Sequence, residues 1–210
     1  MGLADFLAGA LGALGPGGLA LALFLIFVAD AAVFPALPEV WLALFFPVMP
    51  PGGDTLSWGL LLLAMAVAGE AVGNSLLYLV VRHVFVKRGR WPRFLEKAMR
   101  KWTGFLVVPD ERIILVNRVA PVVPFVGAFI AVLKWDYRKS LAYIVVGAAA
   151  KYALLLVLLG TVLSAYPREM AEWLTLVLVF LVIGISALSS LVYRRRLRAK
   201  GAAPETPRPG

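Results

Sequence analysis

The sequence contains no cysteine and a single histidine, His83, among its 210 residues. The missing cysteine excludes disulfides, thiolate catalysis and metal sites built on cysteine. The single histidine excludes a metal site built from several histidines of one chain. Because no nucleophile motif stands out in the rest of the sequence, we expect a protein that is not an enzyme and that holds no metal or other cofactor.

Charged residues are also scarce, at 16% of the chain, while hydrophobic residues make up 61% and the mean hydropathy is +0.87. A soluble domain has about a quarter of its residues charged, so the excess apolar surface here must face lipid. In lipid, only helices or a closed barrel satisfy the backbone hydrogen bonds. The apolar runs are long and continuous and do not alternate, so the sequence predicts an all-α polytopic membrane protein.

Five apolar stretches follow one another along the chain. Three are continuous enough to span a membrane as single helices, and two contain a pair of prolines. The prolines of each pair remove backbone donors and favour two half-helices over one rod. The pairs are Pro35 with Pro38 and Pro121 with Pro124. The stretches are 19–48, 56–81, 113–133, 141–165 and 173–193, of which the first and third contain the prolines.

Lysine and arginine are concentrated in the segment 82–101 and in the segment that starts at Arg194. Basic flanks of membrane segments lie on the cytoplasmic side, so both are expected in the cytoplasm, with the chain in the cell membrane. The same flanks account for the net charge of +9 without a nucleic-acid partner. Residues 201–210 resemble a short disordered tail, so residues 1–200 are expected to form one membrane domain with its core at 28–165.

The link 134–139 is basic too, so the stretch 113–133 begins and ends next to cytoplasmic segments. We therefore expect it to enter the membrane and return, as a re-entrant hairpin whose tip is the second proline pair; a kinked full span is the alternative. If 19–48 is built alike, each half of the protein is a P-x-x-P hairpin followed by one spanning helix. Two such units come out inverted, which is the plan of many secondary transporters. The N-terminal segment has no basic residue to orient it, so whether 19–48 spans or forms a hairpin stays open.

Residues 91–105 place aromatic and aliphatic side chains on one face of a helix and lysine and arginine on the other. Pro92 suits the first turn of this helix and Gly104 its end. A basic amphipathic helix of this kind lies in the cytoplasmic membrane interface, against anionic lipid. It could serve a homodimer as well as a monomer.

Five ionisable residues stand inside the predicted membrane segments. A charge at the bilayer centre costs at least ~2.5–3.5 kcal/mol on insertion scales, so each is expected to have a partner or a task. These residues are Asp30, Glu39, Glu70, Arg118 and Lys151.

Asp30 and Glu39 flank the first proline pair. A carboxyl group in a partly dry site holds a proton near neutrality, so both are candidates for proton or ion coupling; solvation at the interface is the alternative. Arg118 precedes the second proline pair, and a guanidinium binds phosphate with a fork of donors. It is the best candidate for binding an anionic headgroup, and a salt bridge with Asp30, Glu39 or Glu70 is the alternative.

Glu70 begins a polar strip on the stretch 56–81, because four polar residues spaced by four share one helix face. The strip suits a proton or headgroup path from mid-membrane to the cytoplasm, with Glu70 as a third coupling candidate; a structural contact inside the bundle is the alternative. Gly69 and Gly73 form a G-x-x-x-G face that permits close helix approach, within the chain or in a dimer. The strip consists of Glu70, Asn74, Tyr78 and Arg82.

Lys151 lies in the middle of the stretch 141–165, as Glu70 lies in the middle of 56–81. We expect an ion pair between these two residues. Lys151 is also a candidate for headgroup binding, and a purely structural ion pair is the alternative.

Three stretches resemble motifs of the DedA family, also called SNARE-associated or VTT-domain membrane proteins. FPALPEVWL at 34–42 resembles the first-hairpin motif F-P-x-(I/L)-P-x-(E/D), and Asp30 supplies its upstream acid. AVGNSLLYLVVR at 71–82 resembles the helix G-x-x-x-x-x-Y-x-x-G-R of that family. Residues 117–152, which begin NRVAP, resemble the R-(F/V)-x-P second hairpin and the helix that follows it. The order and spacing of the three stretches carry the resemblance.

The resemblance implies two opposed re-entrant hairpins and the translocation or scrambling of a lipid, often coupled to protons or sodium. It implies polyprenyl phosphate or phospholipid as substrate, with Asp30 and Glu39 as coupling acids and Arg118 as the phosphate ligand. Pro124 stands where the family usually has a second arginine, and Lys151 stands near a position that is often tryptophan. We therefore expect a divergent member of the family.

Three functions are compatible with the sequence. The first is a transporter, flippase or scramblase for an anionic membrane lipid, coupled to protons or sodium. The second is a small-solute or drug/proton exporter, and the third is a membrane protein that organises partners without transport. Lipid movement predicts a site that opens laterally, whereas solute export predicts a closed aqueous cavity.

Overall fold

The computed structural model describes residues 15–32, 37–48, 53–86, 110–119 and 125–166, together with scattered positions from 170 to 195. The regular elements in these ranges are all helical, which confirms the predicted all-α class. Among the described residues, three helices are long and apolar enough to cross a membrane: α2 (Gly15–Ala32), α4 (Thr55–Val81) with its continuation to Phe85, and α8 (Tyr137–Ala165). These helices fit the predicted membrane protein.

Both proline-containing stretches are interrupted, as predicted. The first consists of α2 and α3 (Pro38–Phe45), and the second of α6 (Ile113–Val119) and α7 (Val126–Val132). The first stretch is uneven, since α2 has 18 residues and can cross a membrane by length, where a half-helix was expected. Pro38 is the first residue of α3, a position where the missing N–H of proline leaves no donor unpaired. Pro35, Pro121 and Pro124 lie outside the described residues.

The backbone takes the same unusual conformation at both interruptions. Leu37, directly before α3, has φ 50°, and Phe125, directly before α7, has φ 53°. Non-glycine residues rarely adopt this left-handed conformation, since it brings the Cβ atom close to a carbonyl oxygen. The chain therefore turns sharply into each of these two short helices.

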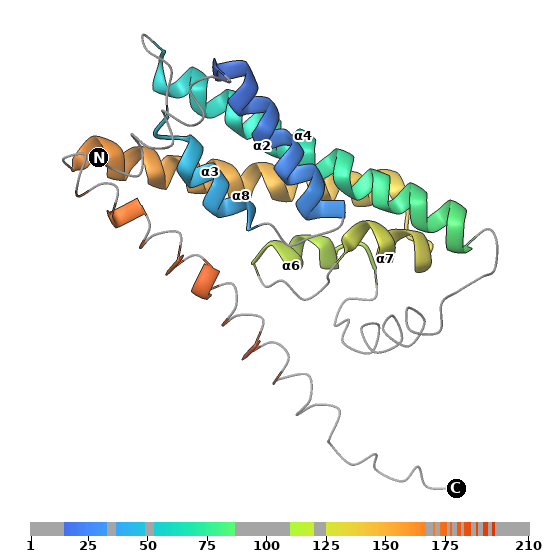
Figure 1. The fold of residues 1–210 in the computed structure, drawn as a ribbon. Helices are drawn as coiled ribbons and strands as arrows, with labels where there is room; N and C mark the ends of the chain where they lie inside the picture. The colour runs from blue at the N-terminus through green and yellow to red at the C-terminus, as the bar shows by residue number, and fades with distance from the viewer. Residues whose placement is uncertain are drawn as a thin grey trace, which may run out of the picture.

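Glycines on α4 set the distance between α4 and α2. A Cβ atom on Gly69 would lie 2.6 Å from the Cβ of Phe27, and one on Gly73 would lie 2.5 Å from the carbonyl oxygen of Val28. The G-x-x-x-G face is thus used inside the chain. The later glycine of α4, Gly73, contacts later residues of α2 than Gly69 does. The two helices α2 and α4 therefore run parallel and side by side (Figure 1).

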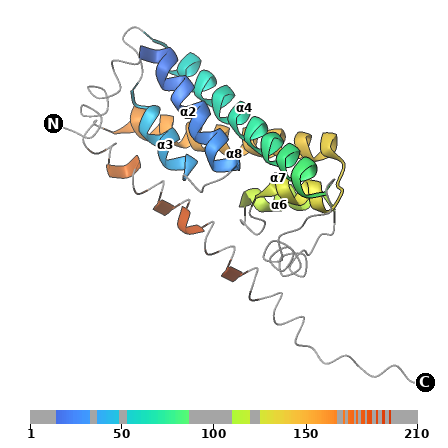
Figure 2. The same cartoon turned by 45° about the vertical axis from the view of Figure 1, so that its right-hand side comes forward.

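Two consecutive parallel helices require the chain to come back between them, and α3 provides the return. The indole of Trp58, in the first turn of α4, donates a hydrogen bond to the carbonyl oxygen of Phe45 at the end of α3, at 3.3 Å. The end of α3 is thereby fastened to the start of α4. In both views α3 lies next to α2, at the start of the α4 helix rather than its end (Figures 1 and 2).

The helix α8 runs antiparallel to α4. At one end, the hydroxyl of Tyr137 donates to Ser75 at 2.8 Å and its ring stacks on Tyr78, with centroids 4.6 Å apart. At the other end, Thr55 of α4 and Ser164 of α8 line the same cavity. The short helices α6 and α7 lie against the end of this pair where α4 finishes (Figure 2).

An aspartate caps the start of each of the two longest helices. Asp54 accepts hydrogen bonds from the backbone N–H and the hydroxyl of Ser57, which hold the pKa of its carboxyl below the ordinary value of 3.8. Asp136 accepts from the backbone N–H groups of Lys139 and Arg138, and its pKa is lowered for the same reason. Both carboxylates satisfy N–H groups that have no partner within the helix.

Apolar side chains form two buried clusters. The first gathers side chains of α2, α3, the first half of α4 and the second half of α8. The second gathers side chains of α6, α7, the second half of α4 and the start of α8. The middle of α4 and the middle of α8, where Glu70 and Lys151 lie, fall where the two clusters meet.

Several predicted elements fall on residues that the structure does not describe. The amphipathic helix at 91–105 and the tail at 201–210 lie outside the described residues, and only scattered positions of the stretch 173–193 are described. Of the basic segment 82–101, the structure describes one π-helical turn, η1 (Arg82–Val86). These elements and the membrane orientation that rests on them stay predictions.

Candidate functional site

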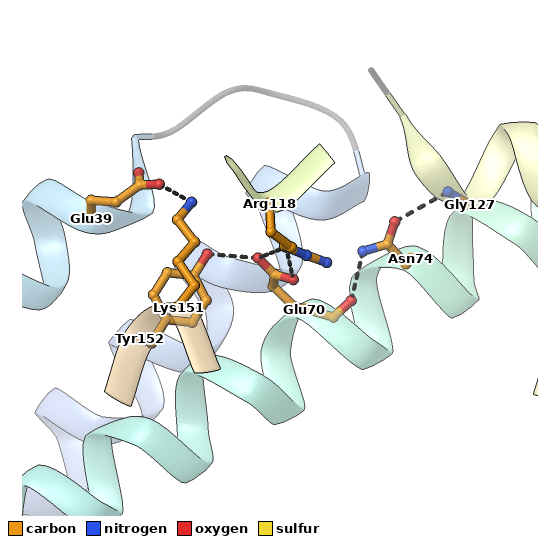
Figure 3. A network of polar contacts seen from close by, with 7 residues as sticks. All are labelled: Glu39, Glu70, Asn74, Arg118, Gly127, Lys151 and Tyr152. Carbon is orange, nitrogen blue, oxygen red and sulfur yellow. Dashed lines mark hydrogen bonds and ion pairs between the residues drawn. The ribbon is translucent and has the colours of Figure 1, made fainter. Parts of the chain in front are cut away.

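Four charged side chains from four helices meet near the middle of the described bundle (Figure 3). Glu39 lies in the first turn of α3, where the helix dipole favours a negative charge. Glu70 lies in the middle of α4, Arg118 near the end of α6, and Lys151 in the middle of α8. The four residues form two ion pairs, and their formal charges sum to zero.

The pair of Glu70 and Arg118 is the more buried of the two. The Nη1 nitrogen of Arg118 lies 2.8 Å from Oε1 of Glu70 and 2.6 Å from Oε2, with hydrogen-bond geometry only at Oε1. The Glu70 side chain is 5% exposed and that of Arg118 14%. The hydroxyl of Tyr152, fully buried on α8, donates a third contact to Oε1 at 2.6 Å.

Removing either partner of such a pair leaves an uncompensated charge in a dry site, which costs roughly 3–5 kcal/mol. Because the three residues come from α4, α6 and α8, their contacts join both halves of the chain. The buried pair therefore holds the two apolar clusters in register with each other.

The pair of Lys151 and Glu39 is more accessible. The Nζ of Lys151 donates a hydrogen bond to Oε1 of Glu39. The Lys151 side chain is 24% exposed and that of Glu39 13%. The Nζ of Lys151 also lies 5.3 Å from the centroid of the Tyr152 ring, so the accessible pair touches the tyrosine that binds Glu70.

The expected ion pair between Glu70 and Lys151 was wrong. Glu70 pairs with Arg118, and Lys151 pairs with Glu39. The helix α6 brings Arg118 over Gly147 to the buried side of α8, so the guanidinium reaches Glu70. Lys151 projects from α8 toward α3. The salt bridge between Arg118 and Glu70, stated as an alternative, is the arrangement present.

A cavity of about 400 Å³ lies at the accessible pair. Its charged lining consists of Glu39, Arg118 and Lys151. Its other lining side chains are aliphatic or small, and come mainly from α8. Val146 and Leu154 among them are each 61% exposed, so the cavity opens sideways through the apolar outer surface of α8. The lining is completed by Leu115, Val146, Gly147, Ala150, Leu154, Leu155 and Leu158.

A glycine makes room for Arg118 beside this cavity. A Cβ atom on Gly147 would lie 2.9 Å from Cγ of Arg118 and 3.3 Å from its Nε. That Nε is buried and has no hydrogen-bond partner among the described residues. A buried donor left without an acceptor costs about 1–3 kcal/mol. Arg118 thus combines one committed nitrogen, Nη1, with one donor that lacks a partner.

The rest of the predicted polar strip makes structural contacts. The side-chain oxygen of Asn74 accepts from the backbone N–H of Gly127 at 3.1 Å, and its amide nitrogen donates to the carbonyl oxygen of Glu70 at 3.0 Å. The Arg82 guanidinium donates to the hydroxyl of Tyr78 at 2.5 Å. Asn74 fixes the start of α7 on α4, and none of these three predicted headgroup ligands lines the cavity.

Of the predicted coupling acids, Glu39 lines the cavity and Glu70 lies behind Arg118. Asp30 lies half-buried in the last turn of α2 and does not line the cavity. Among the described residues, no three carboxylate or histidine side chains gather as a metal site requires.

Tyr152 was missed in the sequence, although a signal for it exists. Ile144, Ala148, Tyr152, Leu155 and Leu159 follow a spacing of three and four, which places them on one helix face. A tyrosine on the buried face of an apolar helix needs a partner for its hydroxyl. The carboxylate of Glu70 is that partner.

Comparison of the chain with protein-family models, with curated proteins and with solved structures gave no match.

Proposed function

We propose that this protein moves a membrane lipid with a phosphate-bearing headgroup across the bilayer, as a flippase or scramblase, in the manner implied by its DedA-like motifs. The observation that carries the proposal is the cavity at Glu39, Arg118 and Lys151. It joins charged groups to an aliphatic lining inside a helical membrane protein. A headgroup binds the charged side chains, while the acyl chains stay on the apolar side.

The lateral opening of the cavity favours a lipid over a water-soluble substrate. Val146 and Leu154, at its rim, are exposed on the outer surface of a helix that is long and apolar enough to span a membrane. Lipid tails surround such a surface, so a lipid reaches the cavity from the side. A solute exporter needs instead an aqueous path that excludes lipid.

The arrangement of the interrupted helices supports the same proposal. We interpret α2 with α3, and α6 with α7, as two re-entrant hairpins of an inverted repeat, because α2 and α4 run parallel and left-handed residues precede both α3 and α7. Glu39 and Arg118 then come from opposite hairpins. Substrate sites of many transporters lie between repeats of this kind.

A flipping assay tests the proposal. The full chain is reconstituted in liposomes, and exchange of a chain-labelled phospholipid between leaflets is followed by chemical quenching from outside. We expect rapid exchange in the parent and a loss of about tenfold or more in Lys151→Gln, since a hydrogen bond to a charged group contributes about 1.5–3 kcal/mol. Lys139→Gln, which removes an exposed lysine at the start of the same helix, serves as the matched control.

Each outcome decides the proposal. Exchange that depends on Lys151 and not on Lys139 supports lipid movement through this cavity. No exchange in the parent at any protein density would overturn it in favour of a membrane protein without transport. If circular dichroism shows that Lys151→Gln is folded and its exchange equals that of the parent, the lipid path does not pass through this cavity.

A further inference from the structure

We propose that the headgroup taken by this cavity carries a primary ammonium next to its phosphate, as in phosphatidylethanolamine. This inference rests on the proposed lipid movement and narrows its substrate. It follows from how the charges around the cavity are paired, and from which donors and acceptors the lining offers.

The charges of the cavity lining cancel in a particular way. The positive charge of Arg118 is balanced by Glu70, which lies directly behind it and is bound by Tyr152 as well. Glu39 and Lys151 balance each other across the cavity. A ligand that enters the cavity therefore meets the carboxylate of Glu39 and the ammonium of Lys151. These groups can bind it only after their ion pair has separated.

A headgroup with a single negative charge satisfies only half of this pair. Its phosphate binds Lys151. The carboxylate of Glu39, whose side chain is 13% exposed, is then left without a counter-charge. An unpaired buried charge is strongly unfavourable. A zwitterionic headgroup avoids this cost, because its phosphate binds Lys151 while its ammonium binds Glu39.

The hydrogen-bond chemistry separates a primary ammonium from a quaternary one. Lys151 presents N–H donors to Glu39, and one of them makes the hydrogen bond between the two side chains. A primary ammonium replaces these donors with its own, whereas a choline group has none. A site built on such a bond discriminates strongly against a ligand that lacks the donor.

The buried pair takes no part in this exchange. The Nη1 of Arg118 stays on Glu70, and its Nε, which has no hydrogen-bond partner among the described residues, is buried and cannot be reached by a ligand in the cavity. The lipid thus binds by exchanging partners at the accessible pair, Glu39 and Lys151, which lies beside the buried pair (Figure 3).

Reconstitution with lipids that differ only in the headgroup tests the inference. The fluorescent label is placed on an acyl chain, so that the ethanolamine nitrogen stays free. Phosphatidylethanolamine, phosphatidylcholine and phosphatidic acid are compared in the same liposomes. We expect phosphatidylethanolamine to move about tenfold faster than the other two, the factor that corresponds to one hydrogen bond between charged groups.

Two variants assign the selectivity to residues. Glu39→Gln is expected to bring the ratio of the phosphatidylethanolamine and phosphatidylcholine rates close to one, because the carboxylate that binds the ammonium is gone. Glu111→Gln removes a half-buried carboxylate that does not line the cavity, and is expected to leave the ratio unchanged. The comparison of headgroups in the parent protein needs no variant, so it stands even if Glu39→Gln fails to fold.

The outcomes separate this inference from the proposed function. Faster movement of phosphatidylethanolamine, abolished in Glu39→Gln, supports both. Equal rates for the three lipids, or the fastest rate for phosphatidic acid, leave lipid movement standing and overturn the ammonium-binding role of Glu39. No movement of any lipid overturns the proposed function itself, and the inference falls with it.

Discussion

Each of the two ion pairs joins a glutamate to a basic side chain, but their surroundings differ. Glu70 and Arg118 are 5% and 14% exposed, and the hydroxyl of Tyr152 adds a further contact to the carboxylate. Glu39 and Lys151 are 13% and 24% exposed, and they line a cavity that opens to the side of the bundle. The difference lies in access, since only the second pair can reach an incoming ligand without unpacking the core.

This difference indicates a division between structure and function inside one polar network. A buried pair contributes little net stability when it forms and costs much when one partner is removed. A partly exposed pair costs less free energy to separate when a ligand in the cavity can take the place of the partner. We therefore expect substitutions in the first pair to unfold the protein and substitutions in the second to change its activity.

The largest effect is expected for Glu70→Ala. The change leaves the guanidinium of Arg118 and the hydroxyl of Tyr152 without their acceptor in a buried site, so the free energy of unfolding should fall by roughly 3–5 kcal/mol. Denaturation in mixed micelles measures this loss. The double variant Glu70→Gln with Arg118→Met removes both charges and should recover most of it. A loss below about 1 kcal/mol in Glu70→Ala would show that water or another anion reaches Arg118, and the contrast between the pairs would disappear.

An intermediate effect is expected for Gly147→Ala. The added methyl group would lie 2.9 Å from Cγ of Arg118, so it pushes the arginine away from Glu70 and should destabilise the protein by about 1–3 kcal/mol. Gly160→Ala on the same helix is the matched control, because its nearest neighbour is 3.8 Å away. That control should be neutral or slightly stabilising, since alanine favours helix over glycine. Equal melting temperatures for the two variants would contradict the close fit of Arg118 over Gly147.

The smallest effect on stability is expected for Glu39→Gln. The glutamine keeps a side-chain oxygen that can accept the hydrogen bond of Lys151, and this pair is more exposed than the first, so the free energy of unfolding should change by about 1 kcal/mol or less. The same denaturation experiment measures it, and the charge-exchanged variant Glu39→Lys with Lys151→Glu should return it to the parent value. A loss as large as that of Glu70→Ala would mean that the second pair is structural too.

Much of the fold followed from local patterns in the sequence. The long apolar runs predicted α4 and α8 nearly to their observed bounds, and the prolines located the interruptions before α3 and α7. The cost of a charge in the membrane directed attention to Glu39, Glu70, Arg118 and Lys151, all of which lie in the network. These features depend on short stretches of chain, where composition and spacing decide the outcome.

The partners within the network could not be predicted in the same way. Helical spacing gives the face on which Glu70 or Lys151 lies, but not the rotation of one helix against another. That rotation depends on distant contacts, such as the glycines that set α2 against α4 and the space at Gly147 that admits Arg118. Asn74 illustrates the same limit, since its contact is a backbone N–H of Gly127 and backbone groups leave no trace in the sequence.

The backbone contacts of α4 also determine which parts of the molecule can move against each other. On one side Gly73 brings α4 to within contact of the Val28 carbonyl, and on the other a Cβ on Gly127 would lie 2.2 Å from the carbonyl oxygen of Asn74. Backbone surfaces this close cannot slide or rotate by a residue without collision. We expect α2, α4 and α7 to behave as one rigid frame during any working cycle. Motion relative to this frame is then expected at the start of α3, where Glu39 reaches α8 through an ion pair that a ligand can open, while the end of α3 stays fastened to α4.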